Sequence, residues 1–376
     1  MDNIKGPICY NNWKAYIDGK PWSFAYEVPL FTDSHITGEI VDGYGPYQFL
    51  NTVPIHKPDV APSIILRLTN HIATEDIVKS EMDRTNAKHY HGGKLQDEIA
   101  ALLSLNLGVR FKAGDSTRTF QVDGDSKGHP CNYIWGENPT LKLSYQGTIL
   151  PYTKKIECLI NNALLLKKLP ELNANDAVTL VKAARLYQDA IWIAESEPAL
   201  SWLLFVSAIE TAADQWHREK NTPAERLKIF DLDLFNILES FGGEKLIDAV
   251  AEKISNVIGA TKKFVDFLIE FIPSPPENRP EPFIQHDWQI NNFQVSFKKI
   301  YGWRSRALHN GISFPAPMCN VPMRSNNSFF AEKPPGLAMM TKGATWMAED
   351  TPMLLHLFEY IVRNALIKWW KTLLPN

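Results

Sequence analysis

The chain has few features that would tie it to a membrane, to the cell exterior or to a cysteine-based metal site. Its longest apolar stretch, residues 199–209, is far shorter than the roughly 20 residues that span a bilayer. No apolar run of the signal-peptide type follows its first residues,. Only four cysteines occur, and they lie far apart with no CxxC pair, as in proteins of a reducing compartment. We therefore expect a cytoplasmic protein with no membrane segment and with no zinc site built from four cysteines.

An excess of positive charge is also missing. Lysine and arginine number 39 against 42 aspartates and glutamates, which gives a net charge of −3. This balance excludes a protein that coats nucleic acid through charge alone, although a small basic pocket remains compatible with it. The sequence contains no Walker, GxGxxG or GxSxG pattern. It therefore gives no support to a P-loop NTPase, a dinucleotide-binding enzyme or a serine hydrolase.

The composition that is present is that of an ordinary globular protein. Hydrophobic residues make up 45% of the chain and charged residues 22%, close to the average. A length of 376 residues exceeds what one hydrophobic core usually organises. We therefore expect two domains.

Residues 1–155 form the first predicted domain, of mixed α+β type, for which we expect a sensor or regulatory role. Short apolar runs alternate there with turn residues, which is typical of strands. The expected strands are 22–31, 36–41, 63–68 and the two arms of a hairpin, 109–112 and 119–122. One helix is expected before Gly108, with an apolar face of Leu95, Ile99, Leu102 and Leu103,. His89 and His91 could ligate a metal ion, but the polar run around them favours a solvated loop, and we expect no metal site.

Residues 156–376 form the second predicted domain, which is all-helical. Apolar residues recur there with a period of 3.6, and the expected helices carry the stripes 177–191, 202–216, 247–268, 293–310 and 354–369. Two proline-rich insertions, 272–289 and 312–349, separate some of these helices. The second insertion shows little periodicity and begins directly after the candidate site described next. We expect it to be mobile and to lie over that site.

Arg304 lies on the apolar face of the predicted fourth helix, in line with Phe293 and Phe297. A guanidinium on such a face needs a carboxylate partner, an open cleft or a subunit interface, because an unpaired buried charge is expensive. His309 lies about 140° around the same helix, in its last turn, where the helix dipole favours the imidazolium. A guanidinium near a titrating imidazole suits phosphate chemistry, since one group neutralises charge and the other transfers a proton.

The run that contains these residues reads Tyr-x-x-Arg-Ser-Arg-x-x-His-x-Gly from Tyr301 to Gly311. It resembles the motif of the HEPN superfamily, and within it the Arg-Ser-(Lys/Arg)-x-x-His-Gly run of the Apea-like HEPN branch. The hydrophobic run from Trp202 to Glu210 is similar to the second helix of that branch. The resemblance covers about residues 170–376 and implies an all-α HEPN-like helical bundle that dimerises, so that the motifs of two chains face one another. Many members of the superfamily are metal-independent ribonucleases of toxin–antitoxin, CRISPR-associated or phage-defence systems.

On this resemblance, Arg304 and His309 form the catalytic pair without a metal or another cofactor. The supporting residues are Glu210, Tyr301, Ser305 and Arg306. Glu210 either orients the catalytic pair or forms an ordinary salt bridge, and Tyr301 either belongs to the core or an interface or stacks on a base. Arg306 points nearly opposite Arg304, although long arginine side chains can still converge near the histidine.

Two further groups of residues are candidates for contacts with RNA or with a second subunit. Lys298 and Lys299 form either a solvated helix face or a track for RNA phosphates. Trp303 and the pair Trp369-Trp370 are expected to be exposed and to contribute to a two-fold homodimer interface.

The resulting hypothesis is a dimeric, metal-independent endoribonuclease of a bacterial defence or toxin type, with RNA as its substrate. The 2′-hydroxyl of RNA would attack the adjacent phosphate, with His309 as general acid or base and Arg304 stabilising the charge. A trigger or antitoxin partner would act on the N-terminal domain. The alternatives are a HEPN dimer that binds a nucleotide or RNA without cutting it, and a purely structural dimerisation domain. The structural alternative requires that Glu210 or Asp214 closes off Arg304 and that His309 caps the helix.

Overall fold

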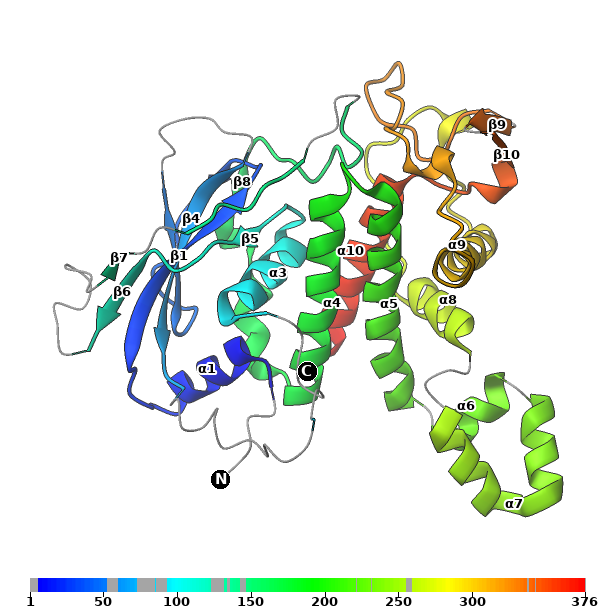
Figure 1. The fold of residues 1–376 in the computed structure, drawn as a ribbon, viewed down its shortest axis with the longest axis horizontal. Coiled ribbons are helices and arrows are strands. Elements are labelled where there is room, and N and C mark those ends of the chain that lie inside the picture. The colour runs from blue at the N-terminus through cyan, green and yellow to red at the C-terminus, as the bar shows by residue number, and fades with distance from the viewer. Residues whose placement is uncertain are drawn as a thin grey trace. The chain divides into compact units, whose positions relative to one another are not determined.

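The computed structural model describes residues 6–52, 60–72, 85, 93–122, 132–133, 136–142, 147–220, 222–230, 232–254, 259–336, 338–341 and 343–375 (Figure 1). The chain divides into two compact units, residues 1–197 together with 369–376, and residues 198–368. The boundary predicted after residue 155 is displaced to the end of α4 (Ala174–Ile193). The reason is that α4 packs against α3 (Leu95–Leu107) of the first unit. His89 and His91 lie outside the described residues.

The first unit is built on an antiparallel sheet whose long central strands are β1 and β4. The strand order is β3-β4-β1-β6-β7, and β5 also pairs with β1. The strands are β1 (Phe24–Thr32), β3 (Tyr47–Asn51), β4 (Ala61–Asn70), β5 (Lys112–Ala113), β6 (Arg118–Gln121) and β7 (Asn132–Tyr133). Val28, Leu66 and Phe49 occupy opposed positions on β1, β4 and β3 and are fully buried. Figure 1 shows α1 (Ile8–Ile17) and α3 on the same side of the sheet.

Several shorter elements complete this unit. A parallel pair joins β2 (Ile36–Thr37) to β8 (Cys158–Leu159), and two 3-10 turns follow, η1 (Ile160–Asn162) and η2 (Leu166–Glu171). The predicted helix before Gly108 is confirmed as α3, and Gly108 takes the left-handed conformation with φ 65°, as a helix C-cap requires. The mixed α+β class of the N-terminal region is therefore confirmed.

The predicted hairpin of 109–112 and 119–122 is wrong. β5 pairs with Leu30 and Phe31 of β1, and β6 pairs with the beginning of the same strand. The two short strands therefore follow one another along one edge of β1 instead of pairing together. Between them, the amide of Gly114 donates to the carbonyl of Pro29 at 2.8 Å, which keeps the chain beside β1. β3 was not predicted, and β2 covers two residues instead of the predicted strand 36–41.

A buried ion network fixes the end of α4 to the rest of the first unit. The side chain of Arg110 is fully buried and donates to Asp33 Oδ2 and Glu195 Oε1, each at 2.7 Å. Its Nε donates to the carbonyl of Ile191 in α4, also at 2.7 Å. One guanidinium therefore holds three separate segments of the unit together.

The second unit is helical apart from one β-hairpin. Its helices are α5 (Pro198–Lys220), α6 (Pro223–Phe230), α7 (Leu232–Ile254), α8 (Ala260–Glu270), α9 (Ile290–Asn310) and most of α10 (Leu355–Thr372). Gly243, with φ 59°, breaks α7 into two helical segments. The hairpin pairs β9 (Ala338–Thr341) with β10 (Ala344–Met347), and three 3-10 turns are η3 (Pro282–Ile284), η4 (Ala316–Cys319) and η5 (Ala348–Asp350). The predicted helical C-terminal half is confirmed, but it is not all-helical because the hairpin interrupts it. No helix in the described ranges is both long and apolar enough to traverse a bilayer.

The stripe 247–268 belongs to two helices rather than to the single helix predicted. α7 ends at Ile254, and α8 begins after Gly259, whose φ of 72° is left-handed. A residue in this conformation cannot continue a right-handed helix. The apolar period alone therefore did not reveal the break.

Aromatic residues dominate the core of the second unit. Trp202 of α5 stacks on Phe358 of α10, with ring centroids 4.6 Å apart, and Phe264 of α8 lies edge-on to Phe297 of α9. Contrary to expectation, Trp369 and Trp370, which stand near the end of α10 and belong to the first unit, are also fully buried. Trp303 is half-buried, and its indole N–H donates to the carbonyl of Asp350. These three tryptophans do not form the exposed apolar patch on which the predicted dimer interface was based.

The insertions 272–289 and 312–349 are tied together by a cluster of polar contacts. Arg279 and Glu332 form a two-pronged ion pair at 2.6 and 2.7 Å. The amide of His286 donates to the same carboxylate at 2.7 Å, and the ring of His356 in α10 contacts the carbonyl of Ala331 at 2.7 Å. The insertion 312–349 is therefore not structureless, although its sequence lacks periodicity.

Candidate functional site

α9 carries the predicted motif, and its buried face holds the helix in place. Phe293, Phe297 and Ile300 are fully buried. Gly311 ends the helix in the left-handed conformation with φ 67°, and its amide bonds back to the carbonyl of Arg306. His309 consequently lies in the last turn and is exposed to solvent.

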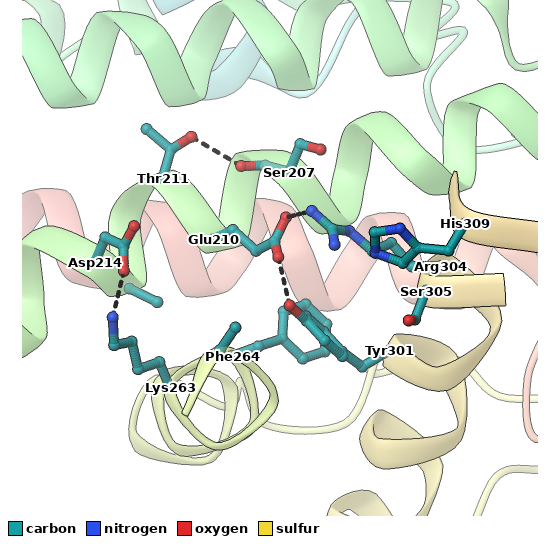
Figure 2. A pocket seen from close by; sticks show the side chains of 12 residues that line it. Ser207, Glu210, Thr211, Asp214, Lys263, Phe264, Tyr301, Arg304, Ser305 and His309 are labelled. Atoms are coloured by element: carbon teal, nitrogen blue, oxygen red, sulfur yellow. Dashed lines mark hydrogen bonds and ion pairs between the residues drawn. The ribbon is translucent and has the colours of Figure 1, made fainter. Parts of the chain in front are cut away.

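A cavity of about 550 Å³ opens among α5, α8 and α9. The predicted residues Glu210, Tyr301, Arg304, Ser305 and His309 all line it (Figure 2). The other lining residues are Ser207, Thr211, Ala213, Asp214, Ala260, Lys263 and Phe264. Folding thus brings α5 and α9, about 90 residues apart in sequence, to one site.

Glu210 is the centre of the hydrogen-bond network in this cavity. Its Oε2 accepts from Arg304 Nη2 at 2.8 Å, and its Oε1 accepts from the hydroxyl of Tyr301 at 2.7 Å (Figure 2). The side chains of Arg304 and Glu210 are each 21% exposed. The Nε of Arg304 is buried and has no hydrogen-bond partner among the described residues. Glu210 therefore orients the guanidinium, but it leaves part of the donor fork unused.

Tyr301 remains protonated in this setting. Burial raises the pKa of its hydroxyl, and the hydrogen bond to Glu210 and the charge of that carboxylate raise the pKa further, while Arg304 acts in the opposite direction. The guanidinium of Arg304 also lies 5.5 Å from the centre of the tyrosine ring, within range of a cation–π contact. Tyr301 thus acts as a hydrogen-bond donor that fixes the position of Glu210.

A second ion pair lines the same cavity. Lys263 Nζ of α8 lies 2.9 Å from Asp214 Oδ1 of α5, and their side chains are 4% and 41% exposed. Figure 2 shows the two pairs held by the same face of α5. Asp214 was expected only as a partner for Arg304, and Lys263 was not predicted as a site residue. The available signal was a lysine inside the buried stripe of α8, next to Phe264 and Val265.

Three predicted residues lie outside the cavity lining. The guanidinium of Arg306 lies 4.5 Å from the centre of the Trp303 ring. Lys299 donates to the backbone carbonyl of Glu349 and pairs with Asp350 at 3.3 Å. Lys298 is exposed. It lies near Asp266, whose pKa is raised by burial, and the charges of Lys262 and Lys298 offset part of this rise.

The cavity therefore offers a guanidinium, a solvent-exposed imidazole and a hydroxyl in one open site. The carboxylate partner that would favour a structural role for Arg304 is present, but it does not close Arg304 off from the cavity. None of the described residues of 312–349 lines the cavity, so the placement expected for this insertion is not observed. Within the described ranges, no group of three or more histidine, cysteine or acidic side chains is placed to hold a metal ion.

Comparisons with family models, with curated proteins and with solved structures find no match to this chain.

Proposed function

We propose that the protein is a metal-independent endoribonuclease in which Arg304 and His309 act at this cavity. The observation that carries the proposal is that both residues line one open cavity while Glu210 holds the guanidinium in place. The resemblance to Apea-like HEPN domains gives the reaction class. We further propose that the cleft is completed in a homodimer of a bacterial defence or toxin type. A trigger or antitoxin would then act through the first unit.

In this reaction the RNA supplies its own nucleophile. His309 takes the proton from the 2′-hydroxyl or gives one to the leaving oxygen, and Arg304 neutralises the charge that develops on the phosphate. Tyr301 keeps its proton and works as a positioning residue through Glu210. The two carboxylates of the cavity are each engaged by a cation, which makes them poor ligands for a divalent ion. The products carry a 2′,3′-cyclic phosphate, and DNA is not cut.

Cleavage of labelled RNA in excess EDTA tests this proposal. We expect His309→Ala to lower the rate roughly 10²–10⁴-fold, because proton transfer is lost. Arg304→Lys is also impaired, since a lysine lacks the planar fork that grips two phosphate oxygens. Arg324→Ala is the matched control, because it removes an exposed arginine of the same unit that lies outside the cavity lining. Light scattering on the same preparations reports whether the active species is a dimer.

Two results would contradict the proposal. One is cleavage that stops in EDTA and returns with magnesium. The other is cleavage that persists undiminished in His309→Ala.

A non-catalytic RNA- or nucleotide-binding module is the second candidate. It is favoured by the fact that Arg304 and Lys263 are both neutralised within the chain, so that the resting cavity carries little net charge. Binding of RNA that depends on Arg304 but is never followed by cleavage would establish this function instead.

A further inference from the structure

The cavity contains a second cation that the proposed reaction does not use. The side chain of Lys263 is almost completely buried, yet this residue lines the same cavity as Arg304. Replacing a buried ion pair with apolar residues of similar volume is often neutral or stabilising. Stability alone therefore does not explain why a lysine occupies this position. Binding of an anionic ligand would explain it.

The two carboxylates that hold the cations belong to one helix. Glu210 and Asp214 are four residues apart on α5, so they lie on one face and are separated by about 6 Å along the helix axis. Each pairs with a cation from a different helix, Arg304 from α9 and Lys263 from α8. One face of α5 thus holds two cations in the same cavity, Arg304 at Glu210 and Lys263 at Asp214 (Figure 2).

In the pair of Lys263 and Asp214, the carboxylate is placed so that another anion can replace it. Asp214 is 41% exposed, whereas Lys263 is 4% exposed. The carboxylate can therefore turn into water while the ammonium stays where it is. A phosphate oxygen that replaces the carboxylate keeps the ammonium paired, which avoids the cost of a lone buried charge. Ala260, the first residue of α8, also lines the cavity, so the positive end of this helix dipole lies at the same site.

We infer that Lys263 forms a second phosphate subsite, so that the cavity takes a single-stranded nucleic acid segment with two successive phosphates. The phosphate that reacts lies at Arg304, and the neighbouring phosphate replaces Asp214 on Lys263. This inference rests on the proposed function for its ligand class. It adds that a mononucleotide fills only half of the site, and that Asp214 competes with the ligand.

The test is binding of two ligands that cannot be cut, a 5′-phosphorylated 2′-deoxydinucleotide with two phosphates and a 2′-deoxynucleoside monophosphate with one. We expect the wild-type protein to prefer the first by roughly tenfold or more, as a charge-assisted contact provides. Lys263→Gln should abolish this preference, and Lys263→Arg should preserve it. Asp214→Asn should strengthen binding of the dinucleotide, because the competing carboxylate loses its charge.

The matched control is the pair of Lys168 and Glu171 in the first unit, which lies outside the cavity lining. Lys168→Gln and Glu171→Gln should leave both affinities unchanged. If Lys263→Gln does not fold, Asp214→Asn and Lys263→Arg still decide the question. Opposite effects of the Asp214 and Lys263 variants support the subsite. Equal effects, no effect on the preference, or no preference in the wild type would overturn it.

The cleavage assay separates this inference from the proposed function. A dinucleotide preference that depends on Lys263, in a protein that never cuts RNA, supports the subsite and rejects the nuclease. Cleavage that requires His309, with a ligand preference that ignores Lys263, supports the nuclease and rejects the subsite.

Discussion

At the scale of single residues, Glu210 links most of the candidate site. One carboxylate accepts from both Tyr301 and Arg304. Hydrogen bonds to an ionised acceptor are about twice as strong as those between neutral groups. The arrangement therefore couples the position of the Tyr301 hydroxyl to the orientation of the guanidinium.

This coupling is measurable in a double-mutant cycle. We expect Glu210→Gln and Tyr301→Phe to interact by roughly 1–3 kcal/mol in urea unfolding, because each removes one partner of the same charge-assisted bond. Tyr360→Phe is the control, since its hydroxyl donates to the neutral carbonyl of Ser274. Combined with Glu210→Gln, it should be additive. Additive behaviour of Tyr301→Phe as well would show that the observed bond contributes nothing.

At the scale of secondary-structure elements, the buried Arg110 holds the end of α4 in the first unit. We expect Arg110→Met to destabilise the unit by about 3–5 kcal/mol, because it leaves the carboxylates of Asp33 and Glu195 buried without a cation. Lys168→Met breaks an exposed pair with Glu171 and should cost less than about 1 kcal/mol. Urea unfolding of both variants measures the difference, and equal costs would contradict a structural role for the network.

The sequence revealed those elements whose signal is local. The apolar period and the terminal Gly311 identified α9, and Arg304 was conspicuous because it interrupts an apolar face. Glu210 was associated with Arg304 through its place at the edge of the second predicted helix. Lys263 was not identified, because nothing in the local sequence of α8 indicates that Asp214 of α5 lies beside it. A lysine in an apolar stripe does not indicate a site until its ion pair with Asp214 is known.

The errors in the first unit have a similar origin. Which strand pairs with which is decided by tertiary contacts, so two short β-runs around a glycine looked like a hairpin. The pairings of β5 and β6 with β1, and the bond from the amide of Gly114 to the carbonyl of Pro29, show that both runs lie along β1. The residues that form β3 fall in a run rich in aromatic and turn residues, where the alternation of burial is visible only in the folded chain.

At the scale of the whole molecule, the contacts between the two insertions give the second unit a dependence on pH. Burial lowers the pKa of His286 and of His356 below the ordinary value of 6.5. The unfolded chain therefore binds protons first as the pH falls. The stabilisation is complete above pH 6.5 and is lost progressively as the pH falls from there toward the folded-state pKa values.

Hydrogen exchange tests this dependence. After correction for the intrinsic effect of pH, protection of the Glu332 and Leu354 amides, which are bonded across this region, should fall between about pH 7.5 and about pH 5.5. His286→Gln and His356→Gln together should flatten the trend. His309→Gln should not, because His309 is exposed. If the loss of protection at low pH persists in the variant that carries both His286→Gln and His356→Gln, these two histidines are not its cause.

The interrupted pairing beside β1 also bears on how this protein avoids aggregation. A long, regular edge strand offers a row of backbone groups to which another chain can add. Here β5 provides two residues and β6 four, and the chain between them is drawn toward Pro29. Among the described residues, this side of the sheet consists of β5, β6 and the two-residue β7 that pairs with β6, and none of these short pieces offers a long template to an incoming strand. The interruption between β5 and β6, which made the hairpin prediction wrong, thus works against intermolecular β-sheet growth.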